Sequence, residues 1–532
     1  RAGGGGGGGR SRRGGGGGGL RAPPPPATGA AGQEQPVQGG KLTVHINRDI
    51  GGFDHIKVPQ GGMGRFQVLN AVHDKLFEKD ADGKIVPKLA VKATAADDFK
   101  RWRVELRKGV KFAPHAANPS EELTSEAYVH HWNRLLGSSL AGRFRAQLGS
   151  NLQKVVAIDK HTVEFQFGEP NLAFRDVMAD GGVYVWFTNA PSFAKKFQDD
   201  PNYNRMSAGA GPYMVKEWVP GKGVTLVKNP NYWDPGSQHL DEIFYRITTG
   251  PETAAAWNAF AAGDLDVMWS LNGSGLARAR KEGDKFNIAN GTRGQLHFSI
   301  NFQASHSPLE DVRVRRALAH AIDRKAIIKI VGRNSPIFAD QSFPPGSPWH
   351  CEGIAYPEFN VEKAKALLAD FGKPVPKIEI WTLNIPSFRK TIEIIQAMWK
   401  KVGVESEIKV GGRGPTGVVF KIVKGETPAW MNPRGPLIHP TVFNMDLHSK
   451  HKNNIWRINS PKLDAAIAKV KAARGDAEVK AAHCAFEKAK TEVVAYMPFQ
   501  YAPAAMMAQK HVGGVRNPND ANLGYHRLWR MK

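Results

Sequence analysis

The sequence contains few cysteines and no long apolar run, and each shortage excludes a class of protein. No stretch reaches about 18 consecutive apolar residues, so no transmembrane helix is expected. Cys351 and Cys484 lack a CxxC partner and a histidine at ligand spacing, which argues against a zinc site. We expect two isolated buried thiols, although an oxidising compartment would allow them to pair.

Signatures of catalysis are also missing. The sequence contains no GxSxG, HExxH or GxxxxGK[ST] motif. The glycines of Gly61–Gly64 lack the spacing of a dinucleotide fingerprint, and a turn beside a strand explains them. His130 and His131 fall in an expected surface helix, where a metal site is not favoured. We therefore predict a protein that is not an enzyme and that uses no cofactor or metal.

Acidic residues are scarce beside basic ones. Lys and Arg number 73, whereas Asp and Glu number 49, which gives a formal net charge of +24 at pH 7. Such a charge permits attraction to nucleic acid, anionic membranes or acidic ligands. The basic residues are scattered, however, and no Lys/Arg run is interleaved with aromatic residues. A solvated basic surface is therefore preferred to a nucleic-acid interface.

The chain has 532 residues, 41% hydrophobic and 23% charged, which is a globular profile too long for one ordinary core. Two or three lobes are therefore expected. Residues 1–40 differ from the rest, because Gly, Pro and Arg dominate them and cannot bury a core. We expect a disordered leader there, with a basic arm for an anionic surface as the alternative. No apolar segment follows its RSRR stretch, so a twin-arginine export signal is not inferred.

Periodicity predicts strands and helices over much of the remaining chain. Residues 311–331 place apolar side chains on one helix face, and Asp311 can cap that helix. Arg313, Arg315 and Arg316 lie mostly off this face, and we expect them to be solvated. A helix is also expected over 125–136, and alternation predicts half-buried strands over 41–47, 160–167 and 223–228.

Helix and strand signals alternate in the region that follows. Asn360 can cap a helix that Gly372 ends, and a strand is expected over 377–383. A helix over 388–402 and a strand over 404–410 come next. This order predicts an α/β lobe with a largely parallel sheet, separate from a more mixed lobe over 41–300.

Four motifs occur in an order that identifies a family. They are RWRVELRKGVKFAP (101–114), GAGPYMVKEWVPGKGVTLVKNPNYWDPG (209–236), DVRVRRALAHAIDRKAIIKIV (311–331) and NVEKAKALLADFGKP (360–374). Together they resemble the family 5 extracellular solute-binding proteins of bacterial ABC transporters, the relatives of dipeptide- and oligopeptide-binding proteins. The resemblance runs from about Lys41 to the C-terminus.

The resemblance implies an α/β, bilobal periplasmic-binding-protein fold of type II, with an extra subdomain and two crossing segments between the lobes. Residues 41–300 would form the first lobe with its inserted subdomain, and 301–500 the second. Residues 501–532 would return to the first lobe. The crossings are expected near 299–311 and 494–507.

The resemblance also implies a function. The chain would be a monomeric receptor that captures a peptide-like or other small solute between its lobes and delivers it to an ABC permease complex. Its place would be the bacterial periplasm or the cell surface. Two alternatives stay open, a binding-protein fold reused as a subunit of a larger assembly and a basic binder of anionic surfaces or nucleic acid.

The segment 430–450 lies where the family carries a cleft segment. Relatives that bind peptides commonly have a Trp followed by an Asp that neutralises the ligand's α-ammonium. Here Trp430 and Arg434 persist, but GPLIHP (435–440) replaces the acids, and the first acid is Asp446. A buried ammonium without a partner costs several kcal/mol, so free peptide N-termini should be disfavoured.

Arg434 instead suits an anionic or neutral ligand, because its planar fork matches a carboxylate or phosphate. The alternative is that Arg434 pairs with a carboxylate of the protein itself. The remaining candidates are His439 and Phe443 of the same segment, Trp381 and Asn384 at the end of a strand, Asn301 at the crossover and Met63 in the Gly-rich turn. For each of them, packing in the core is an equal alternative to ligand contact.

Overall fold

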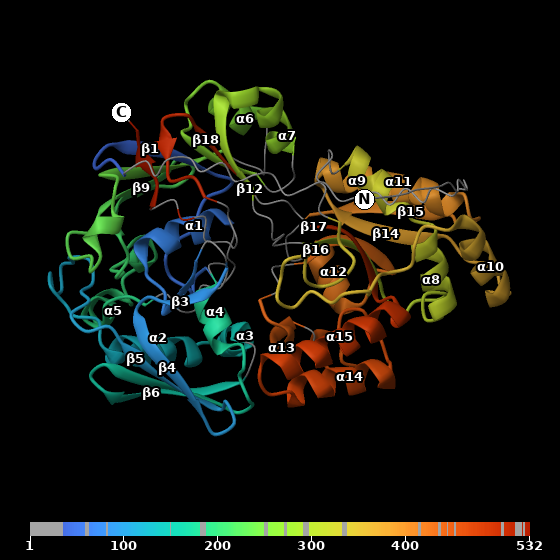
Figure 1. Ribbon diagram of the computed structural model, residues 1–532, viewed down its shortest axis with the longest axis horizontal. Coiled ribbons are helices and arrows are strands. Elements are labelled where there is room, and N and C mark those ends of the chain that lie inside the picture. Colours follow the sequence, from blue (N-terminus) through green and yellow to red (C-terminus); the bar gives the residue numbers. More distant parts are fainter. Residues whose placement is uncertain are drawn as a thin grey trace, which may run out of the picture. The chain divides into compact units, whose positions relative to one another are not determined.

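The computed structural model describes residues 36–58, 63–80, 83–148, 151–180, 188–248, 254–270, 274–290, 297–331, 338–412, 417–434, 438–443, 445–451, 454–501, 505–516, 524 and 527–531 (Figure 1). The expected leader, residues 1–40, lies almost entirely outside this part of the chain. The fold is mixed α/β and contains several sheets.

A seven-stranded sheet forms the first layer of structure, in the order β12-β18-β11-β1-β10-β9-β8. β1 runs parallel to β10 and β11, and its alternating Leu42, Val44 and Ile46 are buried, as the sequence predicts. The strands are β1 (Lys41–Ile46), β8 (Tyr213–Val219), β9 (Gly223–Lys228), β10 (Glu242–Ile247), β11 (Val267–Ser270), β12 (Phe286–Asn290) and β18 (Ala505–Gln509).

A four-stranded antiparallel sheet adds the extra subdomain, in the order β4-β5-β7-β6. Its strands are β4 (Ala90–Ala96), β5 (Arg101–Leu106), β6 (Leu152–Asp159) and β7 (Thr162–Phe167). Val104 and Phe165 share one hydrophobic core with Leu42 and Val44, so this sheet and the seven-stranded sheet are packed together. We call these two sheets and their helices the first lobe.

The helices and short strands of the first lobe connect these two sheets. They are α1 (Met63–Val72), α2 (Ser125–Leu136), α3 (Ala141–Gln147), α4 (Phe174–Ala179), α5 (Pro191–Phe197), α6 (Ala254–Ala261), α7 (Ser274–Lys281), β2 (Phe77–Lys79), β3 (Ile85–Pro87), β19 (Val512–Gly513) and β20 (Trp529–Arg530).

A five-stranded sheet with its own core forms the second lobe, in the order β15-β14-β16-β13-β17. The strands are β13 (His297–Phe302), β14 (Ile378–Leu383), β15 (Ser406–Gly411), β16 (Ala429–Arg434) and β17 (Tyr496–Tyr501). The prediction of a largely parallel sheet is wrong for two of the four strand pairs. β14 is parallel to β15 and β16, but β13 is antiparallel to β16 and β17, because these two strands arrive from outside the alternating region.

The helices of the second lobe include those that the sequence predicts. Asn360 caps α10 by accepting a hydrogen bond from the Lys363 backbone at 2.8 Å, and Gly372 ends that helix at φ +70°. The helices are α8 (Val312–His320), α9 (Arg324–Ile330), α10 (Val361–Phe371), α11 (Pro386–Lys400), α12 (Val418–Lys424), α13 (Pro440–Phe443), α14 (Pro461–Ala472) and α15 (Asp476–Val493).

The helix predicted over 311–331 is two helices. Asp311 caps α8 as expected, but Asp323 accepts from the Ala326 backbone at 3.0 Å and begins α9. The prediction that Arg315 is solvated is also wrong. Arg315 is 4% exposed, and its guanidinium donates to the carbonyls of Leu309 and Val493 at 2.6 and 3.0 Å. The Leu309 carbonyl lies in a loop and the Val493 carbonyl at the end of α15, so both need a hydrogen-bond donor from outside a helix. The helical pattern of the sequence does not reveal this need.

Candidate functional site

The chain passes between the two lobes at one edge of the five-stranded sheet. It leaves the seven-stranded sheet after β12 and enters the five-stranded sheet at the start of β13. It leaves again after β17 and resumes the seven-stranded sheet at β18. His297, the first residue of β13, pairs with Arg434 and with Tyr501, the last residues of β16 and β17.

We call this end of the sheet the crossing edge. β14 is parallel to β16, so the carboxyl end of β14 lies at the same edge. The first change of sheet falls between Asn290 and His297, ahead of the expected 299–311, whereas the second falls within the expected 494–507.

Three predicted site residues lie in one row across the sheet. Trp381 pairs in register with Trp430, and Trp430 pairs with Asn301. The Asn301 amide donates to the Trp430 carbonyl at 3.2 Å, and the Trp456 indole donates to Asn301 Oδ1 at 3.0 Å. Trp430 is 1% exposed and Asn301 4%, so these two residues form the buried part of the row.

Trp381 is the half-buried end of that row. Its indole donates to Glu379 at 2.9 Å, and the Lys421 ammonium of α12 lies 5.1 Å from its ring centroid. Asn384 follows β14 and is exposed beside the crossing edge. These placements give the row a buried centre at Trp430 and Asn301 and a half-buried end at Trp381, four residues along β16 from Arg434 at the crossing edge.

The remaining candidates are placed by their backbones. Arg434 is the last residue of β16, Phe443 the last of α13 and Met63 the first of α1. Their side chains lie outside the described part of the structure. Arg434 therefore belongs to the crossing edge by its strand register with His297.

His439 is buried between other side chains. Its ring centroid lies 4.7 Å from that of Trp349, and its Nδ1 lies 2.8 Å from Thr441 Oγ1. Burial lowers the pKa of His439 to about 3, so the ring is neutral at pH 7. Ile438 and Val442, on either side, pack against the core of the first lobe. The segment thus contacts both lobes, which the sequence did not reveal.

A disulfide holds the loop that carries Trp349. Cys351 and Cys484 are joined at an S–S distance of 2.06 Å, so the prediction of two isolated thiols is wrong. They are 133 residues apart in sequence, and the packing of α15 against the loop brings them together. Such proximity depends on tertiary structure that local sequence does not encode.

An ion pair lies beside the disulfide, on the same helix. Glu487 and Lys490 are fully buried, and Lys490 Nζ lies 2.7 Å from Glu487 Oε2. Lys490 also donates to Ser342 Oγ at 2.5 Å, and the Ser342 backbone donates to Glu487 at 3.3 Å. Burial raises the pKa of Glu487, but the charge of Lys490, the neighbouring His483 and the hydrogen bonds from Lys490 and Ser342 together outweigh burial and keep the pKa of this carboxyl below its usual value.

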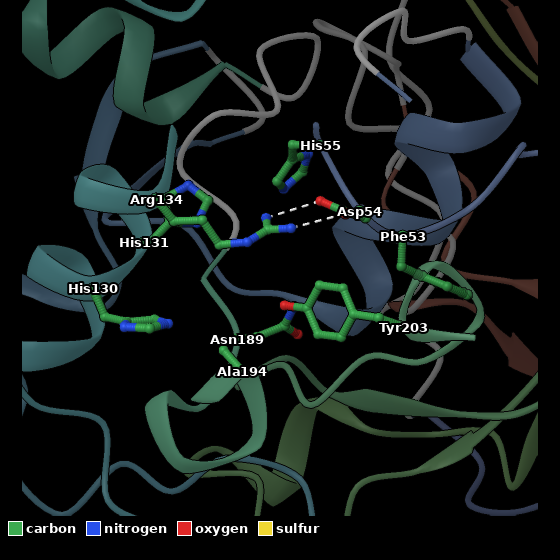
Figure 2. A pocket seen from close by; sticks show the side chains of 9 residues that line it. All are labelled: Phe53, Asp54, His55, His130, His131, Arg134, Asn189, Ala194 and Tyr203. Carbon is green, nitrogen blue, oxygen red and sulfur yellow. Dashed lines mark hydrogen bonds and ion pairs between the residues drawn. The ribbon is translucent and has the colours of Figure 1, made fainter. Parts of the chain in front are cut away.

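The histidines of α2 line a small cavity in the first lobe (Figure 2). Arg134 donates to both carboxylate oxygens of Asp54 at 2.9 Å, which ties α2 to the loop after β1. His131 is buried with its ring centroid 5.6 Å from that of His55, so the expected surface helix has a buried face. The cavity measures about 20 Å³, which has room for a water molecule and not for a solute.

The described residues contain no group of three or more His, Cys, Asp or Glu side chains arranged to hold a metal ion. They also contain no helix that is both long and apolar enough to cross a membrane.

Comparison with known proteins identifies the family. Residues 84–454 match the family described as bacterial extracellular solute-binding proteins, family 5 Middle. The chain belongs to this family. It is a family of binding proteins, which agrees with a site built from strand ends, aromatic rings and amides.

Two curated relatives and a solved structure extend the comparison. The chain is 24% identical over 515 residues to the probable di/tripeptide-binding protein 5 of Pseudomonas aeruginosa, covering 91% of this chain and 94% of the relative. It is 24% identical over 355 residues to the dipeptide-binding protein of Escherichia coli, covering 63% of this chain and 65% of that relative's length.

The solved structure is NikA from Brucella suis in complex with Fe(III)-EDTA, with a TM-score of 0.80 and 19% identity. The likeness covers 92% of this chain and 100% of that one, and it shows the same bilobal fold.

This family 5 binding protein has an acid-poor segment at its crossing edge. No acid occurs from Trp430 to Met445, and Asp446 of the following turn is the first. Glu379 of β14 lies 3.7 Å from Lys409 and accepts from Trp381, so its charge has partners within the sheet. The arrangement can bind and orient a ligand through hydrogen bonds and aromatic contacts.

Proposed function

We propose that this chain is the substrate-binding receptor of an ABC-type importer, which captures a small solute at the crossing edge and delivers it to a membrane permease. The observation that carries the proposal is that β14 and β16 end where the chain crosses between lobes. Open α/β sheets bind ligands at the carboxyl ends of their strands. A ligand held there contacts both lobes and favours their closure.

The proposed lobes are 41–300 and 301–500, with 501–532 returning to the first. The residues proposed to contact the ligand have different roles. Arg434 and Asn384 supply polar groups, and Trp381 supplies an accessible ring. Trp430 and Asn301 form the floor beneath them, and His439, Phe443 and Met63 complete the walls.

We propose an anionic or neutral ligand in place of a peptide with a free N-terminus. The acid-poor segment supports this, because an α-ammonium buried there would lack a carboxylate partner. Arg434 would bind a carboxylate or phosphate oxygen of the ligand. Relatives include proteins named for di- and tripeptides, so a peptide-like solute with a blocked or absent amine fits both observations.

Calorimetric titration tests this specificity with trialanine and N-acetyl-trialanine. We expect the acetylated peptide to bind at least as tightly as the free one. Tight binding of trialanine together with loss of binding on acetylation would show that the site recognises an ammonium, and the proposal of ligand class would be wrong.

A bacterial receptor of this kind acts in the periplasm or tethered to the cell surface, and we propose that this chain does so as a monomer. The family match supports this place. The positive charge is scattered along the chain, which does not favour the alternative of a nucleic-acid binder. A gel shift with heterologous DNA that weakens steeply with salt would support that alternative. Co-purification with a stable partner, and no thermal shift with any solute, would support the fixed-subunit alternative.

A further inference from the structure

The two lobes touch where α4 of the first lobe meets the start of α15 of the second. Leu172, just ahead of α4, packs against a cluster that contains Ala473 and Val479 of the second lobe. The Asp98 carboxylate of the first lobe accepts from Arg474 Nη2 at 2.6 Å. Both contacts join residues of different lobes, so they exist only while the lobes are together. We call this contact the flank face.

Two carboxylates belong to the flank face, one on each lobe. Asp176 lies on α4, one helical turn beyond Leu172, and Asp476 is the first residue of α15, two residues after Arg474. They are close enough for the charge of Asp476 to raise the pKa of Asp176. In the described part of the structure, neither carboxylate forms an ion pair with another residue. The lobes therefore bring like charges together at a face that otherwise holds them in contact.

The position of Asp476 favours its negative charge. The first turn of a long helix exposes unpaired backbone N–H groups and the positive end of the helix dipole, which stabilise a carboxylate there. Asp476 is also exposed to solvent, which hydrates the charge. Glu478 of the same turn is already used, because it accepts from the Arg474 backbone at 2.7 Å. Asp476 thus supplies a lasting negative charge opposite α4.

Asp176 is less favourable as an anion. It is half-buried, and burial raises its pKa to about 6. Lys79, Arg175 and the backbone amide of Asp176 itself lower that pKa, whereas Asp476 raises it. A proton therefore binds Asp176 in mildly acidic solution, while the lobes are together.

The charged groups of the first lobe near α4 have partners of their own. β2 and β3 pack against α4, and β3 carries no titratable side chain. Lys79 Nζ of β2 lies 3.5 Å from Asp180, and Glu78 of β2 forms ion pairs with two other cations. Lys75, just before β2, donates to a carbonyl at the end of α4 at 3.1 Å. These groups stay within the first lobe when the lobes separate, so Asp476 is the charge whose distance from Asp176 changes.

We propose that the Asp176–Asp476 pair makes closure of the lobes depend on pH, with acid favouring the closed receptor. At neutral pH both carboxylates are charged and repel each other across the flank face. Protonation of Asp176 removes this repulsion. The Arg474–Asp98 ion pair persists in acid, because Arg474 keeps the pKa of Asp98 below its usual value. The inference rests on the proposed function only in that the receptor must open and close.

The direction of the effect follows from where the proton binds more tightly. Opening removes Asp476 and exposes Asp176 to water, so the pKa of Asp176 falls toward its usual value of 3.8. The closed form therefore binds the proton more tightly than the open form. Closure should gain stability as the pH falls through 6, and the gain should be complete below 3.8.

Small-angle X-ray scattering of the full chain without added solute, at pH 7.5 and pH 5.5, tests the proposal. We expect the ratio of closed to open wild type to be about fourfold higher at pH 5.5. Asp176→Asn imitates the protonated form, so it should be more closed than the wild type at pH 7.5 and lose this pH response. Glu362→Gln is the matched control, because it removes an 83% exposed carboxylate of α10, and it should respond as the wild type does.

An equal pH response in the wild type and Asp176→Asn overturns the proposal, as does a wild type that stays unchanged or opens in acid. Asp476→Asn tests the facing charge, and it should be more closed than the wild type at pH 7.5. A variant no more closed than the wild type there would show that the two carboxylates do not repel across the flank face. Because no solute is added, a wrong solute class at the crossing edge would leave these results unchanged.

Discussion

Arg474 and Asp98 join the two lobes through a two-pronged ion pair. Arg474 Nη2 donates to Asp98 Oδ2 at 2.6 Å, and its Nε donates to Oδ1. Its Nη1 donates to the carbonyls of Lys471, Ala472 and Ala473 at 2.9, 2.8 and 3.0 Å, which fixes the guanidinium at the end of α14. Asp98 lies in the turn between β4 and β5, in the subdomain of the first lobe.

The Arg474–Asp98 pair is predicted to favour the closed receptor. Replacing Arg474 by Gln should lower solute affinity a fewfold, because closure would lose a contact that both lobes supply. The matched control is Lys195→Gln, which breaks an exposed ion pair with Glu126 inside the first lobe. Calorimetry of both variants checks this, and equal affinities in the two would show that the pair plays no part in closure.

Acid should destabilise the chain through His439. Burial lowers the pKa of His439 to about 3, so between pH 6.5 and 3 the unfolded state binds a proton that the folded state excludes. The stability is complete above pH 6.5 and falls as the pH decreases toward 3. At pH 5 the loss from this residue is about 2 kcal/mol.

His439→Phe should reduce the pH dependence of stability, because phenylalanine keeps an aromatic contact with Trp349 and cannot be protonated. Urea unfolding at pH 7 and pH 5 measures the effect. The wild type should lose about 2 kcal/mol more than the variant between these pH values. An identical loss in both proteins would mean that His439 is protonated in the folded state.

The Cys351–Cys484 disulfide is predicted to stabilise the fold. Replacing both cysteines by Ser should lower the free energy of unfolding by about 2–5 kcal/mol, because the bond closes a long loop of the unfolded chain. Denaturant unfolding with and without dithiothreitol measures this. The reductant should destabilise the wild type and leave the double variant unchanged, and an unaffected wild type would contradict the prediction.

Lys490→Met should destabilise the chain by about 3–5 kcal/mol, because it leaves the buried carboxylate of Glu487 without its cation. The control is the double variant Lys490→Met, Glu487→Gln, in which no buried charge is left unpaired. It should be closer to the wild type than the single variant in denaturant unfolding. A double variant as unstable as the single one would show that packing around Lys490, not its charge, determines the effect.

Local signals in the sequence predicted much of the second lobe. Asn360 caps the start of α10 and Gly372 caps its end, as expected, since capping depends on a few neighbouring residues. The burial of Arg315 and the Cys351–Cys484 bond depend on contacts between distant segments, so periodicity and spacing could not reveal them. The antiparallel β13 and β17 were missed for the same reason, because their pairing is set by the crossings.

The candidate site was predicted unevenly. The order of helices and strands indicated that Trp381 belongs to a strand and that Asn384 follows it, and the structure places Trp381 within β14 and Asn384 directly after it. The row that joins Trp381, Trp430 and Asn301 depends on strand register, which the sequence did not specify. The edge-to-face contact of His439 with Trp349 joins two loops, and no local signal marks it.

Mass spectrometry of material released when the natively purified chain is denatured tests the central claim most directly. A receptor that closes over its solute retains it through purification. We predict one small molecule in near-equal amount to the chain, without a free α-amine, and its loss from an Arg434→Gln variant. Release of no small molecule, or equal release from the wild type and the variant, would contradict a solute site at the crossing edge.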